Sequence, residues 1–410
     1  MTALATETRP FDWFRTLGPR GRRAFAGAFG GYGLDSFDYQ TLPLGLAAIT
    51  AYFGISSGEA GLLGTTTLVV SAVGGVAAGI LADKIGRVRA LQITIAMYTI
   101  FTVLCGFAPN FETLLVLRGL QGLGFGGEWA VGAALVAEYA QARYRGRTVA
   151  FVQSAWAVGW GLSVIVYTVV FSVASPDLAW RIMFWAGVIP AVLVLWIRRS
   201  VQESPIMASR ERPEKGTLAK IFHRDHLRTT LFAAMLATGC QGGYYTLSTW
   251  LPTYLKKTRG LSVIGTGGYL AFLITGAFIG YVCAGYLTDL MGRKKTFLLF
   301  AATSAALIVA YTQIPNGANG LVLVLGFPLG FSMSAIFSGF GAYLAELYPT
   351  ALRGTGQGFT YNFGRAVGAA FPAIVGFLGA GGAIVFGALG YAIAALALLG
   401  LPETRGRELT

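Results

Sequence analysis

Long apolar runs separated by short polar segments make up most of this chain. Twelve of the runs are long enough to cross a bilayer, because about 20 helical residues at a rise of 1.5 Å span a hydrocarbon core of ~30 Å. They lie at 24–50, 59–82, 90–107, 112–137, 149–173, 178–198, 229–254, 266–288, 296–314, 318–344, 355–379 and 381–400. The pattern predicts an all-α membrane protein with 12 transmembrane helices.

Composition agrees with this prediction. Only 12% of the 410 residues are charged and 55% are hydrophobic, whereas a soluble protein has about a quarter of its residues charged. The three cysteines lie inside apolar runs and both histidines, His223 and His226, lie in a polar loop. No metal-ligand spacing, catalytic triad or nucleotide-binding loop is present in the sequence, so we expect no metal, no cofactor and no enzymatic activity.

The distribution of positive charge predicts the orientation. The net charge is +13, but most of the 31 Lys and Arg residues fall in the terminal tails and in alternate loops, which the positive-inside rule places in the cytoplasm. This pattern favours a bacterial inner membrane with both termini cytoplasmic, rather than nucleic-acid binding. The run Lys256-Lys257-Thr258-Arg259 is a local exception on the outer side. It is either a solvated loop or a funnel for anions.

The two halves of the chain are related. The segment from Gly79 to Arg87, GILADKIGR, is similar to GYLTDLMGR from Gly285 to Arg293, and Glu138 with Arg145 is echoed by Glu346 with Arg353. We therefore predict a cytoplasmic tail (1–23), a six-helix bundle (24–198), a cytoplasmic loop (199–228), a second six-helix bundle (229–400) and a tail (401–410). One chain holds both halves, so a monomer is sufficient.

The segment 79–90 resembles the signature of the major facilitator superfamily between its second and third helices, and 285–296 is a second copy. PETRGREL at 402–409 is similar to the tail motif of sugar porters. The resemblance covers essentially the whole chain and implies two bundles that rock about a central site. It also implies a cytoplasmic gate, formed by Asp83, Arg87, Asp289 and Arg293 with Glu138, Arg145, Glu346 and Arg353 as partners. A purely topological role of the basic residues is compatible with this gate.

Ionisable residues inside predicted spans are few and are functional candidates, because burying them is costly. Asp35 and Asp38 share one face of the first span, while Arg118 and Glu128 lie in the fourth. Neighbouring carboxylates cannot both stay ionised cheaply, which makes Asp35, Asp38 and Glu128 candidate proton carriers with Arg118 as counter-charge. The alternative is a static ion network that only fixes helix register.

Arg365, in the eleventh span, is the candidate for binding an anion. The second half has no acid inside its spans away from the cytoplasmic ends. A guanidinium can hold a carboxylate through two parallel hydrogen bonds, and Asn362 on the same face is a candidate to share the contact. Alternatively, Arg365 pairs with Asp35 or Asp38 across the cavity, and a substrate could compete with the aspartate.

Three segments sharpen the resemblance. GYGLDSFDYQTLP at 31–43, LRGLQGLGFGGEW at 117–129 and YNFGRAVGA at 361–369 resemble the aromatic-acid:proton, sialate:proton and metabolite:proton symporters. This implies uptake of an organic carboxylate with protons. Candidate lining residues are Tyr361, Gln241, Tyr244, Tyr245, Gln153, Trp156 and Trp160, although aromatic residues of membrane helices also serve in packing.

Three other functions remain open from the sequence. A sugar porter for a neutral substrate is suggested by the PETRG tail, but Arg365 argues against it. A cation or drug exporter would use Asp35 and Glu128 to bind its substrate. A non-transporting sensor would need an appended signalling domain, for which a central loop of about 30 residues leaves no room.

Overall fold

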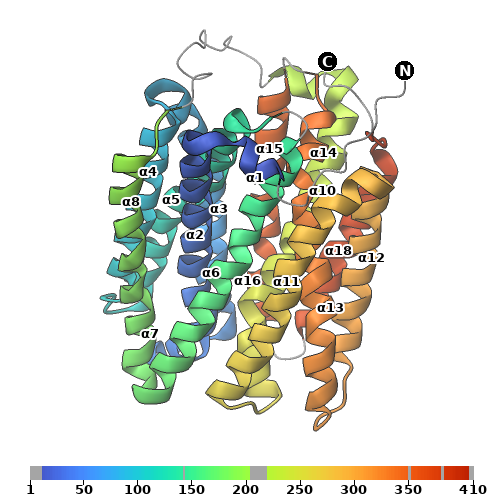
Figure 1. Ribbon diagram of the computed structural model, residues 1–410. Coiled ribbons are helices and arrows are strands. Elements are labelled where there is room, and N and C mark those ends of the chain that lie inside the picture. Colours follow the sequence, from blue (N-terminus) through green and yellow to red (C-terminus); the bar gives the residue numbers. More distant parts are fainter. Residues whose placement is uncertain (1–11, 142–143, 204–218, 350–351, 380–382, 406–410) are drawn as a thin grey trace, which may run out of the picture.

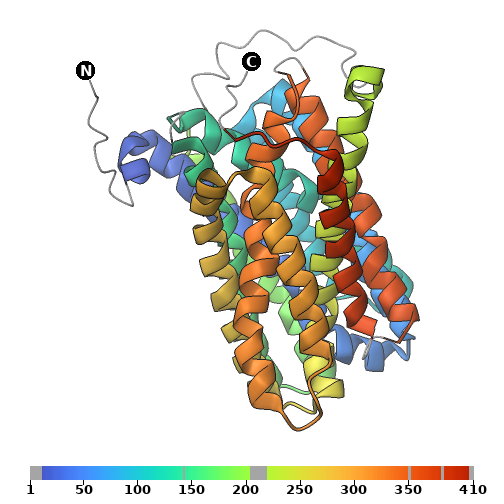
Figure 2. The same ribbon diagram turned by 90° about the vertical axis from the view of Figure 1, so that its right-hand side faces the viewer.

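The computed structural model describes residues 12–141, 144–203, 219–349, 352–379 and 383–405. Every regular element in this part of the chain is helical. The helices run roughly side by side, with the N-terminal group, blue to green, next to the C-terminal group, yellow to red (Figure 1). The view turned by 90° looks onto the C-terminal helices and shows the same long bundle (Figure 2).

The N-terminal half contains the helices that precede residue 204. They are α1 (Asp12–Thr16), α2 (Gly18–Phe53), α3 (Ser57–Ile85), α4 (Arg87–Cys105), α5 (Phe111–Tyr139), α6 (Arg145–Val173), α7 (Pro176–Trp185), the 3-10 turn η2 (Ala186–Val188) and α8 (Ile189–Ser200). Side-chain caps define several starts: Asn110 Oδ1 accepts from the N–H of Thr113 at 2.9 Å, and Ser56 with Glu59 forms a reciprocal capping box before α3.

The C-terminal half repeats this arrangement. Its elements are η3 (Ala219–Phe222), α10 (Arg224–Thr253), the π-helical turn η4 (Tyr254–Thr258), α11 (Val263–Met291), α12 (Arg293–Thr312), α13 (Asn319–Ser338), α14 (Phe340–Glu346), α15 (Arg353–Gly368), α16 (Ala370–Phe377), η5 (Ile384–Phe386), α18 (Gly387–Ala397) and η6 (Leu398–Gly400). The helical stretches match the twelve predicted spans, although several spans are built from two or three consecutive helical pieces.

Seven helical stretches in the described residues are long and apolar enough to cross a membrane: α3, α4, α6, α7 with α8, α11, α12, and α13 with α14. The helices α2, α5, α10 and α15 are not among them. These four carry the buried polar and charged residues described below, which lower their mean hydropathy. Their length and packing nevertheless place them inside the bundle rather than at its surface.

Small residues let the helices approach closely within each half. A Cβ atom added at Gly126 of α5 would overlap the carbonyl oxygen of Ser71 in α3, and one added at Gly330 of α13 would overlap that of Leu273 in α11. Such close backbone contact is how membrane helices gain packing energy without a hydrophobic driving force between them. The same device therefore occurs in both halves.

The halves meet along two seams, where α6 packs on α11 and α3 packs on α15 and α16. In the second seam, Thr65 Oγ1 donates a hydrogen bond to the carbonyl oxygen of Ala369 at 2.6 Å. Between the seams, the indole N–H of Trp156 in α6 donates to the hydroxyl of Tyr244 in α10 at 2.5 Å. These contacts bring the centres of both halves together.

The predicted span at 355–379 is interrupted at Ala369, between α15 and α16. Pro372 has no N–H to donate to the carbonyl four residues earlier, so the helix cannot run through it unchanged. The neighbouring carbonyl oxygens of Ala369 and Pro372 accept side-chain hydrogen bonds, from Thr65 and from the indole of Trp250 at 2.9 Å. These hydrogen bonds hold the start of α16 against α3 and α10.

Candidate functional site

Arg365 lies near the middle of the bundle on α15 and is 3% exposed. Its Nε donates to Oε1 of Gln241 at 3.3 Å, and Nε2 of Gln241 donates to the carbonyl oxygen of Tyr361 at 2.9 Å. The Nη1 atom is buried and has no hydrogen-bond acceptor among the described residues. The guanidinium is thus held in place on one edge and unpaired on another.

Aromatic rings from both halves surround this guanidinium. Its central carbon lies 5.1 Å from the ring centre of Tyr361 on the same helix and 5.5 Å from that of Phe125 on α5. Both distances are within the range of cation–π attraction. Because Phe125 comes from the N-terminal half and Tyr361 from the C-terminal half, the position of Arg365 depends on how the halves are packed.

A wider set of rings extends from these two. Tyr39 lies 5.5 Å from Phe125 and 5.3 Å from Tyr245, and Trp156 lies 5.3 Å from Tyr32. All five rings are at most 8% exposed. The structure therefore places the predicted residues Gln241, Tyr361 and Tyr245 near Arg365, and the predicted residues Trp156 and Tyr244 next to these rings.

Asp38 of α2 is held by a chain of hydrogen bonds through the N-terminal half. Its Oδ2 accepts from Thr102 Oγ1 at 3.2 Å, and Thr102 Oγ1 accepts from Nε2 of Gln121 at 2.7 Å. The Oε1 atom of Gln121 accepts in turn from Nη1 of Arg118. Asp38 and Arg118, both fully buried, are thus opposite charges linked by two polar side chains.

Asp35 and Glu128 have a different environment. The carboxylate of Glu128 packs on the backbone of Gly31, one helical turn before Asp35 on the same face of α2. The two acids interact electrostatically, and Asp35 is also within reach of Arg365 and Asp38. Both oxygens of Glu128 and Oδ1 of Asp35 have no hydrogen-bond partner among the described residues. Burial without donors favours the protonated form of a carboxyl group.

Two functional candidates on α4 were missed by sequence reasoning. Thr102 binds Asp38, and Tyr98 lies one turn earlier with its hydroxyl buried and unpartnered in the described part of the chain. Tyr98 is within electrostatic reach of Asp35, Asp38 and Glu128. Neither residue is charged, so the search for ionisable groups did not find them. The sequence signal for them is that two polar side chains lie four residues apart, and so on one helix face, inside an apolar span.

Three predicted lining residues occupy other positions. Asn362 faces α3, where its Oδ1 lies against Gly75, and its Nδ2 donates to the carbonyl oxygen of Gly358 at 2.9 Å. The structure does not place its amide beside the Arg365 guanidinium. Trp160 is buried with its ring centre 6.5 Å from that of Tyr244, and Gln153 is buried on α6.

The predicted gate residues lie at one end of the bundle, next to the loops that carry most of the positive charge. Arg293 forms two hydrogen bonds with Glu346, from Nε at 3.1 Å and from Nη2 at 2.9 Å. Arg87 is buried at the start of α4. The side chains of Asp83, Glu138, Arg145, Asp289 and Arg353 lie outside the described part of the structure.

Two glutamates not predicted as site residues complete this end. Glu203 accepts from the N–H of Val88 at 3.1 Å, and Glu403 accepts from the N–H groups of Arg293 at 2.8 Å and Lys294 at 3.1 Å. Each glutamate caps the helix that follows a signature motif, α4 or α12. Partial burial would raise the pKa of Glu403, but its backbone hydrogen bonds outweigh this and hold the pKa below its ordinary value. The sequence signal for both glutamates is the similarity between VQES at 201–204 and LPET at 401–404, each at the end of a half.

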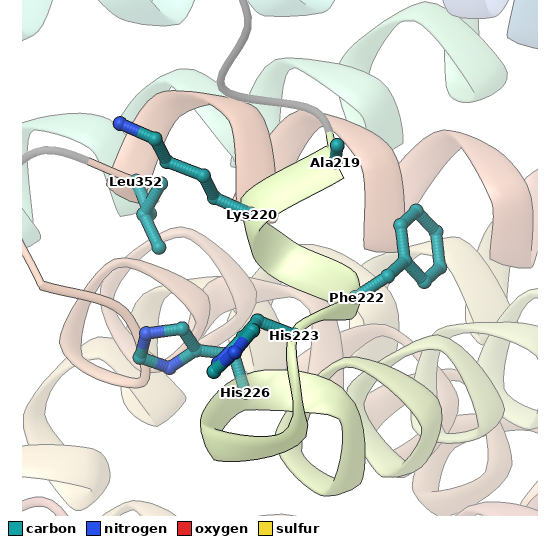
Figure 3. A pocket seen from close by; sticks show the side chains of 6 residues that line it. All are labelled: Ala219, Lys220, Phe222, His223, His226 and Leu352. Carbon is teal, nitrogen blue, oxygen red and sulfur yellow. The ribbon is translucent and has the colours of Figure 1, made fainter.

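A surface hollow of about 560 Å³ lies near the start of α10, apart from the buried residues around Arg365 (Figure 3). Its lining residues are Ala219, Lys220, Phe222, His223, His226 and Leu352. Nδ1 of His223 lies 3.1 Å from Oδ2 of the exposed Asp225. The hollow includes none of the buried ionisable residues and is not the functional centre.

Comparison with protein families identifies the relatives of this arrangement. The model of the family described as Major Facilitator Superfamily matches residues 28–373 and 269–408. A probable 4-methylmuconolactone transporter of Cupriavidus pinatubonensis is 41% identical, over 97% of this chain and 94% of its own length. A cis,cis-muconate transport protein of Acinetobacter baylyi is 33% identical, over 89% of each chain.

Solved structures share the fold. A xylose transporter from Escherichia coli in a partially occluded inward-open conformation superposes with a TM-score of 0.76 at 21% identity, covering 95% of this chain and 100% of that one. At this level of identity the match concerns the arrangement of helices alone.

Proposed function

The chain belongs to the Major Facilitator Superfamily, and from this premise we propose that it imports an organic carboxylate together with protons. Members of this family are multi-pass membrane transporters and not enzymes. We place the protein in a bacterial inner membrane with both termini cytoplasmic, because most of the positive charge lies at that end.

One observation carries the proposal: a buried guanidinium at the half interface has an unpaired N–H group and is enclosed by aromatic rings. A buried cation recognises an anion better than an array of sugar hydroxyls, because desolvating a cation is costly unless a negative charge replaces the water. The unpaired Nη1 of Arg365 can donate to a carboxylate, and a guanidinium binds such a group through two parallel hydrogen bonds when both of its donors are available. The rings of Tyr361, Phe125 and Tyr39 suit the flat face of a conjugated or aromatic acid.

Proton coupling follows from the acids next to this cation. Asp35 is within electrostatic reach of Arg365 and is its available counter-charge when no substrate is bound. An incoming carboxylate replaces Asp35 as the counter-charge of Arg365, and Asp35 is then a buried acid that gains by taking up a proton. Binding of the anion and binding of the proton thus support each other. Asp38 and Arg118 balance each other nearby.

The relatives support the substrate class. One is named for 4-methylmuconolactone and one for cis,cis-muconate, which is a conjugated dicarboxylate. We therefore expect a compact unsaturated or aromatic acid. The two six-helix halves (24–198 and 229–400) rock about this centre, and the ion pair of Arg293 with Glu346 belongs to the cytoplasmic gate that opens and closes.

The test is proton movement into liposomes that contain the purified protein. Benzoate, nicotinate, cis,cis-muconate and N-acetylneuraminate are added in turn, with xylose and tetraethylammonium as neutral and cationic probes. We expect one of the acids to make the outside alkaline, and Arg365→Ala and Asp35→Asn to abolish the signal. Arg228→Ala, which removes an exposed arginine, is the control. A response to xylose or to the cation alone, unaffected by Arg365→Ala, would contradict the proposal.

A further inference from the structure

The ionisable residues buried in the middle of the bundle include more acids than arginines. Seven charged residues are buried in the described part of the chain, and two of them, Arg87 at the start of α4 and Arg259 after η4, lie at the ends of helices. The other five are three acids and two arginines: Asp35, Asp38, Glu128, Arg118 and Arg365. If all five were ionised, the centre would carry one uncompensated negative charge. A low-dielectric interior disfavours such a charge, and an acid removes it by binding a proton.

The contacts indicate which acid holds that proton. Asp38 accepts a hydrogen bond from Thr102 and is linked to Arg118 through Gln121. Asp35 is within reach of Arg365 across the half interface.

Among the described residues, Glu128 accepts no hydrogen bond and no cation acts on it electrostatically. From α2, Gly31 packs on its carboxyl group and Asp35 interacts with it electrostatically, and from α4 the hydroxyl-bearing Tyr98 lies within its electrostatic reach. In the described part of the chain both of its oxygens are buried without a partner.

We infer that Glu128 keeps a resident proton while the site is empty, and that one further proton binds Asp35 when a monocarboxylate binds Arg365. In the empty site, ionised Asp35 balances Arg365, ionised Asp38 balances Arg118, and protonated Glu128 is neutral. A monocarboxylate on Arg365 restores one excess negative charge, and one proton on Asp35 removes it. The anion and this proton then cross together with no net charge. The second step rests on the proposed function, whereas the resident proton does not.

The resident proton is tested without any substrate. Infrared spectra of the purified protein at neutral pH should contain the C=O stretching band of a protonated carboxyl group, because exposed carboxylates are ionised there. Glu128→Gln should remove the band, and Glu112→Gln, an exposed residue of the same helix, should leave it. A band that survives Glu128→Gln, or no band in the parent protein, would overturn the assignment.

The charge balance is tested by voltage. Liposomes are loaded with potassium and treated with valinomycin to impose a membrane potential without a pH gradient, and the uptake of benzoate and nicotinate is followed. If one net charge crossed per cycle, about 100 mV would change the accumulation about 50-fold. We expect the accumulation of the acid to be unchanged by voltage and to follow an imposed pH gradient.

Accumulation driven by voltage alone would overturn electroneutral transport. Failure of the parent protein to move any acid would instead contradict the proposed function, and the infrared band would still decide on the resident proton.

Discussion

The position of Glu128 depends on a side chain that is missing from the neighbouring helix. A Cβ atom at Gly31 would overlap Oε1 of Glu128. We therefore expect Gly31→Ala to push this carboxyl group away from Asp35, although the substitution changes no ionisable residue. Overpacking of this kind costs about 1–3 kcal/mol, so proton-coupled uptake in liposomes should fall roughly tenfold or more.

Gly45→Ala is the matched control on the same helix, because its new Cβ would meet Trp180 at an ordinary contact distance of 3.4 Å. Equal losses in both variants would show that α2 simply tolerates no alanine, and would remove the special role of Gly31.

Gln241 positions Arg365, the arginine proposed to bind the substrate, by accepting a hydrogen bond from its Nε. Gln241→Ala should leave Arg365 less well positioned and raise the KM of uptake more than it lowers kcat. A hydrogen bond to a charged group contributes about 1.5–3 kcal/mol, which corresponds to a rise in KM of roughly 10- to 100-fold. Gln313→Ala, after α12 at the far end of the half, is the control. A fall in kcat at constant KM would speak against a positioning role.

The ionisable residues of the sequence indicate most members of the buried cluster around Arg365. They do not indicate which of these residues interact with one another. Asp35 and Asp38 share a helix face and were treated as one pair. In the structure Asp38 belongs to the network of Thr102, Gln121 and Arg118, while Asp35 faces Glu128 and Arg365. The division depends on which neutral side chains of α4 face α2. Helix rotation within the bundle decides this, and an apolar span of weak periodicity does not reveal it.

At the scale of the elements, the start of α12 is capped by Glu403, a glutamate that follows the last helix of the same half. Glu403 accepts hydrogen bonds from the backbone of Arg293 and Lys294, in the first turn of α12. Loss of such a cap costs about 1 kcal/mol. Glu403→Ala should therefore lower the melting temperature of the detergent-purified protein, and Arg405→Ala, an exposed neighbour, should not.

The same contact predicts a dependence on pH. Because the pKa of Glu403 in the folded protein is below its ordinary value, its stabilisation is complete above the ordinary glutamate pKa of about 4.3 and is lost as the pH falls through the lowered folded value. The difference in melting temperature between parent and Glu403→Ala should shrink in acid. A difference that is constant down to the acid limit would contradict the assignment of the cap to an ionised carboxylate.

Element boundaries were predictable where the chain carries a cap or a glycine, and less so inside a span. The capping box at Ser56 and the left-handed Gly54 agree with the predicted gap between the first two spans. The interruption at Ala369 was not predicted. Pro372 signals a kink, and the tertiary partners Thr65 and Trp250 stabilise the carbonyl groups around it.

At the scale of the whole molecule, the two halves pack closely at the end that the positive-inside rule predicts to face outside. A Cβ atom at Gly61 of α3 would lie 2.8 Å from the carbonyl oxygen of Pro372 in α16. A larger residue there should keep this seam from closing. We expect Gly61→Leu to abolish uptake and to expose the centre from outside, so that a cysteine at Tyr245 reacts with an impermeant maleimide.

Gly64→Leu is the control for this experiment, because its Cβ would meet Thr249 no closer than 3.9 Å. If the Tyr245→Cys variant is equally unreactive with and without Gly61→Leu, the contact between α3 and α16 is not the gate that closes the site.

The indole of Trp156 gives the molecule an optical signal of its own. Its N–H is donated across the half interface to Tyr244, and the ring is 3% exposed. Any rocking that separates α6 from α10 must break this bond and let water reach the ring. Fluorescence emission of the protein should then shift to longer wavelength, with a component that Trp156→Phe removes. The transport cycle could thus be followed in real time without an attached dye, by light that the protein itself emits.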